Sequence, residues 1–164
     1  MLFEHWLFCF YFGVDFRDII HKIFWKNFCN KSNMSRGIEL PETTVLVADD
    51  ESSIRNLIAD VCATILSGKV RIIQASSAPQ AIHHLQTVPT IDLVCTDLEM
   101  PRAEDGNLVA KTALGMGKAV IVCSCTPEKL AKDVKAGVSE VFSKPFSSIR
   151  DFRLRVESLL LDKI

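Results

Sequence analysis

The 164-residue chain has almost no net charge and few aromatic side chains beyond its first 28 residues. Its 19 basic residues nearly balance 20 acidic ones, which gives a formal charge of −1. No overall charge therefore directs the chain to nucleic acid or to an acidic substrate. No segment repeats at a fixed period and none is low in complexity, so repeat architectures are excluded. The length suits one compact domain with a real core.

Long apolar runs and nucleotide-binding motifs are also lacking. The longest uncharged run in residues 1–28 is the nine-residue WLFCFYFGV, whereas a membrane-spanning helix needs about 20 apolar residues. The same segment lacks a basic stretch and a small-residue cleavage site, so it is a poor secretory signal. The GMGK sequence at 115–118 lacks the earlier glycine of a phosphate-binding loop, which argues against a nucleotide enzyme.

The six cysteines follow neither a disulfide framework nor a metal-binding pattern. Cys95 and Cys123 lie in apolar runs, where a thiol usually serves as a small core side chain. Cys123 and Cys125 have no second Cys or His pair at ligand spacing. We therefore expect reduced thiols and a cytoplasmic protein.

Residues 1–33 differ sharply in composition from the rest of the chain. Of the 13 aromatic residues, counted as ten Phe, two Trp and one Tyr, ten lie within residues 1–28. Six apolar residues there share one face of a possible helix: Phe16, Ile19, Ile20, Ile23, Phe24 and Phe28. The segment is either a helix that contacts a membrane surface or a partner, or an extension produced by a mis-assigned start, with Met34 as the true one. Residues 34–43 are then a linker, and 44–164 form the folded domain.

From residue 44 onward, short apolar runs alternate with amphipathic patterns. The apolar runs predict five strands: 44–48, 70–75, 91–96, 119–123 and 140–142. Apolar spacing and capping residues predict helices that start near Ser52, after Ser77, near Asn107, at Thr126–Pro127 and at Ile149. Strands that alternate with helices favour a parallel sheet covered on both faces.

Polar side chains follow four of these strands. Asp49 and Asp50 follow the first, Asp97 the third, Ser124 the fourth and Lys144 the fifth. Because parallel strands end at the same edge of a sheet, we expect these side chains to converge. Three clustered carboxylates repel one another unless a cation lies among them, and Mg²⁺ suits a site with few carboxylates. Asp97 beside Mg²⁺ and a lysine is a layout for an aspartyl-phosphate, with Ser124 donating a hydrogen bond.

Residues 44–161 resemble the receiver domain of response regulators in two-component signalling. The matching sequences are VLVADDE, DLVCTDLEMP, VIVCS, and KAG followed by SKPF, in this order. The resemblance implies a doubly wound five-stranded parallel sheet of the flavodoxin-like order 2-1-3-4-5, with helices on both faces.

The resemblance also implies a role for each matching polar residue. Asp97 would accept the phosphoryl group, while Asp49, Asp50 and Asp97 would hold Mg²⁺. The main-chain carbonyl of Glu99 would be a further metal ligand. Ser124 would be the switch hydroxyl and Lys144 the phosphate-binding lysine, with a cis bond between Lys144 and Pro145.

The implied function is a stand-alone phosphoacceptor in a phosphorelay. The phosphoryl donor would be the phosphohistidine of a sensor histidine kinase or of a histidine phosphotransfer protein. The signal would pass to an unidentified protein target, without contact to nucleic acid. Such a receiver is not an enzyme in the usual sense, since it catalyses transfer only to its own Asp97.

Two departures from the family leave alternatives open. The family usually has an aromatic residue three places before the lysine, where this chain has Val141, and Phe142 should face the other side of the strand. The loops after Pro101 and Ser124 also differ in length. One alternative is therefore an interaction module that works without phosphorylation. A less favoured one is a phosphohydrolase of another doubly wound fold, although such enzymes commonly carry the nucleophile on strand one.

Overall fold

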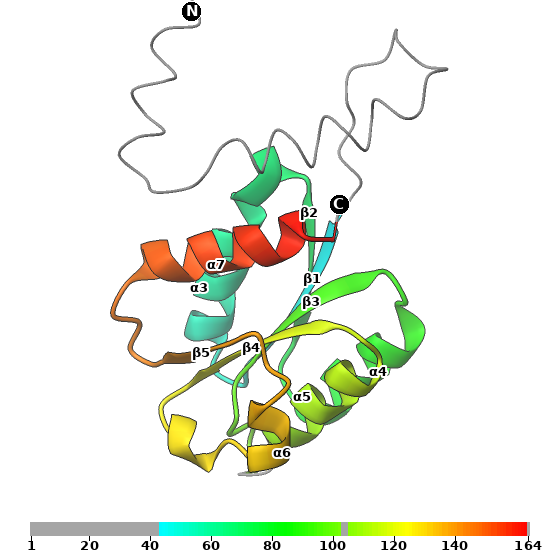
Figure 1. Cartoon of the computed structure of the whole chain (residues 1–164), viewed down its shortest axis with the longest axis vertical. Coiled ribbons are helices and arrows are strands. Elements are labelled where there is room, and N and C mark those ends of the chain that lie inside the picture. Colours follow the sequence, from blue (N-terminus) through cyan, green and yellow to red (C-terminus); the bar gives the residue numbers. More distant parts are fainter. Residues whose placement is uncertain (1–42, 103–104, 164) are drawn as a thin grey trace, which may run out of the picture. The chain divides into compact units, whose positions relative to one another are not determined.

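The computed structural model describes residues 43–102 and 105–163, in which strands and helices alternate as predicted (Figure 1). The strands are β1 (Thr43–Ala48), β2 (Val70–Ala75), β3 (Ile91–Thr96), β4 (Ala119–Ser124) and β5 (Glu140–Ser143). The helices are α3 (Ser52–Ala63), α4 (Ala78–Thr87), α5 (Asp105–Gly115), α6 (Lys132–Lys135) and α7 (Ile149–Leu161), with 3₁₀ turns η1 (Ile65–Gly68) and η2 (Pro127–Lys129). The predictions for residues 1–33 and for the linker lie outside the described residues, except that Thr43 already belongs to β1.

The five strands form one parallel sheet in the order β2-β1-β3-β4-β5, which confirms the predicted fold. The last residues of neighbouring strands stand in register: Ala48 lies beside Ala75 and Thr96, and Ser124 lies beside Ser143. All strands therefore end at a common edge, and the residues that follow them are brought together there.

Helices cover the sheet in two layers (Figure 1). The α3 and α7 helices lie on one face, and α4, α5 and α6 lie on the other. The inner strands β1, β3 and β4 are almost entirely buried, whereas the edge strands β2 and β5 are partly exposed. Continuous apolar runs such as VLVA and VIVC are what two covered faces require, because both sets of alternating side chains are buried.

The two faces separate Val141 from Phe142, as strand alternation predicts. Val141 packs against the buried cluster formed with α4, α5 and α6. Phe142 instead meets Phe152 of α7 edge to face, with ring centroids 5.3 Å apart and planes at 80°. The aromatic ring of β5 therefore lies on the opposite side of the sheet from Val141.

The predicted helix from Thr126–Pro127 to Gly137 is wrong as a continuous element. A 3₁₀ turn at Pro127–Lys129 is followed by non-helical backbone at Leu130 and Ala131, and α6 has only four residues. The predicted apolar pair Leu130 and Val134 is nonetheless buried, at 5% and 2% exposure. Asn107 explains the break, because its side chain donates to Lys129 O at 3.2 Å and accepts from Ala131 N at 2.9 Å. These side-chain bonds compete with helical ones.

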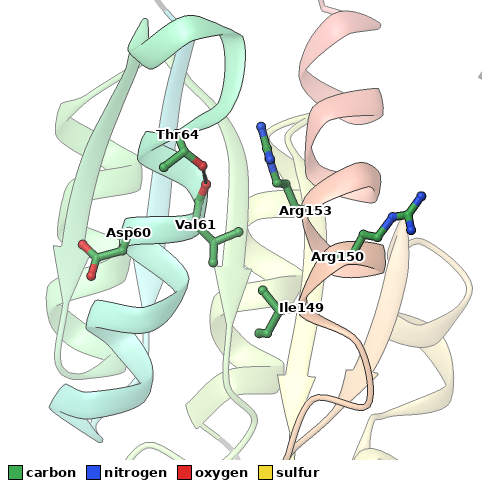
Figure 2. A pocket seen from close by; sticks show the side chains of 6 residues that line it. All are labelled: Asp60, Val61, Thr64, Ile149, Arg150 and Arg153. Atoms are coloured by element: carbon green, nitrogen blue, oxygen red, sulfur yellow. Dashed lines mark hydrogen bonds between the residues drawn. The ribbon is translucent and has the colours of Figure 1, made fainter. Parts of the chain in front are cut away.

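On the sheet face covered by α3 and α7, a shallow groove separates these two helices (Figure 2). It has a volume of about 460 Å³ and is lined by Asp60, Val61, Thr64, Ile149, Arg150 and Arg153. None of the site residues predicted from the sequence lines this groove.

Among residues 43–102 and 105–163, no helix is long and apolar enough to cross a membrane.

Candidate functional site

Three carboxylates come together at the edge where the strands end. Asp49, Asp50 and Asp97 each offer an oxygen, and these oxygens lie within 4.8 Å of one another. Asp49 is fully buried and Asp97 is 9% exposed, whereas Asp50 is open to solvent. The predicted convergence of strand-end residues from β1 and β3 is therefore present.

Lys144, which directly follows the edge strand β5, joins this cluster. Its ammonium nitrogen lies 2.5 Å from Asp49 Oδ2 and 3.0 Å from Asp97 Oδ2. The lysine side chain is only 6% exposed, so the three charges interact with little screening by water. The residue reaches this place because β5 ends beside β4, where Lys144 N donates to Ser124 O at 2.9 Å. The Lys144–Pro145 bond is cis, in agreement with the sequence prediction.

Burial and charge pairing act in opposite directions on these groups. Burial is the largest influence on Asp49 and raises its pKa, although hydrogen bonding to Lys144 opposes the change. Burial also opposes the charge of Lys144, but hydrogen bonds to Asp49 and Asp97 outweigh it and raise the lysine pKa. Burial therefore makes a negative charge at Asp49 costly, and the nearby ammonium of Lys144 offsets part of this cost.

The backbone fixes the position of the Asp97 carboxylate. Asp97 N donates to Ala48 O at 2.9 Å, which extends the pairing of β3 with β1 by one residue. Leu98 N donates to Asp97 Oδ1 at 2.6 Å, and the Thr96 hydroxyl donates to Asp97 O at 2.9 Å. One carboxylate oxygen is thus held by the backbone and the other faces Lys144.

Gly106 allows the chain to pass close behind Asp97. A Cβ atom at this position would lie 1.9 Å from Asp97 O and 2.3 Å from Leu98 Cα, distances that no side chain tolerates. Gly106 N also donates to Leu98 O at 2.9 Å, so the start of α5 supports the loop directly. The glycine is required by this close approach.

Arg55 fixes the backbone of the Asp49–Asp50 pair, a role that the sequence did not predict. Its guanidinium donates to Asp49 O at 2.7 Å and to Asp50 O at 3.4 Å, and it also bonds Gln74 Oε1 at 3.1 Å. Glu51 N donates to Asp49 Oδ1 at 2.9 Å. An arginine five residues after an Asp–Asp pair carries no specific sequence signal, so this role was visible only in the structure.

Ser124 lies at the same edge but its hydroxyl contacts its own loop. Ser124 is fully buried, and its Oγ accepts from Thr126 N at 3.1 Å and lies 3.4 Å from Thr126 Oγ1. The Thr126 hydroxyl in turn donates to the Glu99 carboxylate at 3.1 Å. Glu99, proposed from the sequence for its main-chain carbonyl, thus also uses its side chain, which the sequence did not indicate.

The donor set suits a hard divalent cation. All three groups of the acidic cluster offer carboxylate oxygens, the ligands that Mg²⁺ prefers, and few protein ligands leave room for bound water. Asp49, Asp50 and Asp97 are the residues that would hold it.

The described cysteines are all free, and burial raises the pKa of Cys123, as expected for a core thiol.

The comparison with protein families agrees with this geometry. The response regulator receiver domain family matches residues 45–157. The chain belongs to this family. Receiver domains of response regulators are signalling domains of two-component systems, and the acidic cluster described above is consistent with their phosphorylation site. A comparison with curated proteins finds no match.

Solved structures of receivers have the same fold. A response regulator receiver protein from Pseudomonas putida is 26% identical with a TM-score of 0.60, and the match covers 73% of this chain and 99% of that one. A receiver domain protein from Methanospirillum hungatei JF-1 is 20% identical with a TM-score of 0.62, covering 75% and 96%. A receiver domain protein from Clostridium thermocellum is 22% identical with a TM-score of 0.57, covering 74% and 96%.

Proposed function

We propose that this receiver takes a phosphoryl group from a phosphohistidine onto Asp97, with Mg²⁺, and signals by binding a protein partner. The observation that carries the proposal is the placement of Lys144, whose ammonium contacts both Asp49 Oδ2 and Asp97 Oδ2 at the common edge of the sheet. A carboxylate held between two acids and a buried cation is arranged for transfer of an anionic group rather than for packing.

In the proposed reaction a carboxylate oxygen of Asp97 attacks phosphorus. A phosphorus–oxygen bond forms while the phosphorus–nitrogen bond of the donor breaks, and the electron pair returns to the imidazole ring. Lys144 offsets the negative charge of the phosphoryl oxygens, and backbone N–H of Leu98 holds Asp97 in orientation. Mg²⁺, held by Asp49, Asp50, Asp97 and the Glu99 carbonyl, would supply further charge neutralisation. The Ser124 hydroxyl would donate a hydrogen bond to the phosphoryl group.

The partners implied are a sensor histidine kinase or a histidine phosphotransfer protein as donor, and a protein target downstream. One transfer per chain makes the domain a relay component rather than an enzyme that turns over a substrate. A module that works without phosphorylation remains the second candidate, favoured by Val141 on β5, where the family usually has an aromatic residue.

Intact-protein mass after incubation with acetyl phosphate and Mg²⁺ tests the proposal. We expect the wild-type chain to gain one phosphoryl group and Asp97→Asn to gain none. Asp92→Asn is the matched control, because Asp92 lies on the same strand and its Oδ2 accepts from Thr44 N at 2.9 Å, a bond that asparagine can keep. Equal modification of wild type and Asp97→Asn would remove Asp97 from the role.

The same sample separates the alternatives. No modification of the wild-type chain at any Mg²⁺ concentration would favour the phosphorylation-independent module. Continuous release of phosphate from a simple phosphate ester, well beyond one equivalent per chain, would favour a phosphohydrolase.

A further inference from the structure

The Glu99 side chain bridges the two loops that border Asp97. Its Oε1 lies 2.5 Å from Lys129 Nζ, and its Oε2 accepts from the Thr126 hydroxyl at 3.1 Å. Glu99 belongs to the loop after β3, two residues beyond Asp97, whereas Thr126 and Lys129 belong to the loop after β4. Both carboxylate oxygens of Glu99 are therefore occupied by groups of the β4 loop.

This bridge continues to the buried hydroxyl of Ser124. Thr126, held by Glu99, donates its backbone N–H to Ser124 Oγ at 3.1 Å. The contacts therefore run without interruption from the Asp97 loop, through Glu99 and Thr126, to the proposed switch hydroxyl. In this arrangement the Ser124 hydroxyl oxygen accepts a hydrogen bond from the backbone of its own loop.

The far end of the β4 loop is fixed to α5. Asn107 is 8% exposed and bonds both Lys129 O, at 3.2 Å, and Ala131 N, at 2.9 Å. Lys129 thus lies between two restraints, with its ammonium on Glu99 and its carbonyl on Asn107. A change at Glu99 would therefore alter the restraint on the short segment that leads into α6.

We propose that Glu99 and Lys129 form a latch that holds the β4 loop in its unphosphorylated arrangement and so limits the rate at which Asp97 is phosphorylated. The inference rests on the proposed phosphoacceptor role of Asp97. For Ser124 to donate to a phosphoryl group, its hydroxyl must give up the 3.4 Å contact with Thr126 Oγ1, and the latch holds Thr126 at that position. A contact present in only one of two states shifts their balance by its own free energy.

The expected effect is modest because the pair is partly exposed. The Glu99 and Lys129 side chains are 37% and 48% exposed, and ion pairs of this kind change an equilibrium by roughly twofold to fivefold. Breaking the latch should therefore accelerate phosphorylation by acetyl phosphate by roughly that factor. The difference should shrink in about 1 M salt, where surface charges are screened.

Two single variants distinguish a latch from simple attraction of an anionic donor. Glu99→Gln removes a negative charge and Lys129→Gln removes a positive one. If the charges acted only on the donor, the first variant would be faster and the second slower. The latch predicts that both are faster, and that the swapped pair Glu99→Lys with Lys129→Glu returns toward the wild-type rate.

Lys111→Gln is the matched control. Lys111 forms an exposed ion pair with Asp133 at 2.9 Å, so the variant loses the same charge and a similar contact, but away from Glu99. We expect its phosphorylation rate to equal that of wild type within error. Acceleration as large as in Lys129→Gln, or opposite changes in the two latch variants, would overturn the proposal.

Hydrogen exchange without any phosphoryl donor tests the latch independently of the proposed function. Amides of residues 125–131 should exchange roughly twofold to fivefold faster in both Glu99→Gln and Lys129→Gln than in wild type. Unchanged exchange overturns the latch even where Asp97 is phosphorylated normally. Faster exchange in a chain that accepts no phosphoryl group supports the latch as a restraint on the loop and counts against the phosphoacceptor role instead.

Discussion

Two halves of the candidate site share one edge of the sheet but are built differently. In the acceptor half, formed by Asp49, Asp50, Asp97 and Lys144, two of the acids contact a buried lysine directly, and the three acids offer oxygens within 4.8 Å of one another. In the response half, formed by residues 124–135 and β5, the contacts run through hydroxyl, amide and exposed charged side chains. No aromatic side chain of β5 faces α5 and α6, because that position is Val141.

This difference shows which part of a receiver is fixed by the sheet itself. The acceptor half is determined by the ends of parallel strands, because only those positions bring acids from β1 and β3 beside a lysine from β5. The response half depends on loop conformation and helix length, which can vary without disturbing the sheet. We therefore expect the acceptor half to respond sharply to small changes and the response half to respond weakly.

The largest effect is expected where the acceptor half leaves no space. Gly106→Ala would place a methyl group 1.9 Å from Asp97 O, so the backbone of the Asp97 loop would have to move. We expect a loss of about 3 kcal/mol or more in the free energy of unfolding, measured by urea denaturation.

Gly115→Ala is the matched control within the same helix. A Cβ atom there meets nothing within 4 Å, and alanine is the better helix former. This variant should be unchanged or more stable by about 0.5–1 kcal/mol. Similar losses for both glycine variants would show that the close approach behind Asp97 is not the cause.

Metal binding should stabilise the acceptor half by mass action. At a Mg²⁺ concentration about 100-fold above the dissociation constant, the gain is about 2.7 kcal/mol, which thermal melts would register as a higher Tm. Asp50→Ala should lose most of this gain, while Asp60→Ala, an exposed acid on α3, should keep it. A wild-type Tm that does not change in millimolar Mg²⁺ would count heavily against the site.

A pH dependence follows from the raised pKa of Lys144. Because the folded chain holds this proton more tightly than the unfolded chain, the stabilisation is complete below the ordinary value of 10.5. It is lost as the pH rises through the folded pKa, which lies above that value. Urea denaturation between pH 9 and pH 11.5 should therefore show a steeper fall in wild type than in Lys144→Gln. Parallel curves would mean that the lysine is not held by Asp49 and Asp97.

The sequence predicts the acceptor half well because its signals are local. Apolar runs that end in polar residues gave the strands, and the rule that parallel strands end at one edge gave the convergence of Asp49, Asp50, Asp97 and Lys144. The motifs that resemble receivers supplied the strand order, which periodicity alone does not determine.

The response half was predicted less well because its contacts join distant residues. Glu99 and Lys129 are 30 positions apart, and the Asn107 bonds span 22 and 24, so no spacing rule connects them. The same Asn107 bonds interrupt the helix that the sequence predicts after Thr126. Apolar spacing identified the buried Leu130 and Val134 correctly but could not show that the helix is interrupted at Leu130 and Ala131.

Hydrogen exchange in Mg²⁺ with and without fluoroberyllate, a phosphoryl mimic, tests the contrast between the two halves most directly. We expect the largest change in protection in residues 124–130, because the β4 loop must adjust to a group on Asp97. Residues 139–143 should change less, since Val141 has no ring to turn inward. Asp97→Asn should show neither change. Equal changes in residues 139–143 and 124–130 would contradict the account, because β5 would then carry the signal without an aromatic residue.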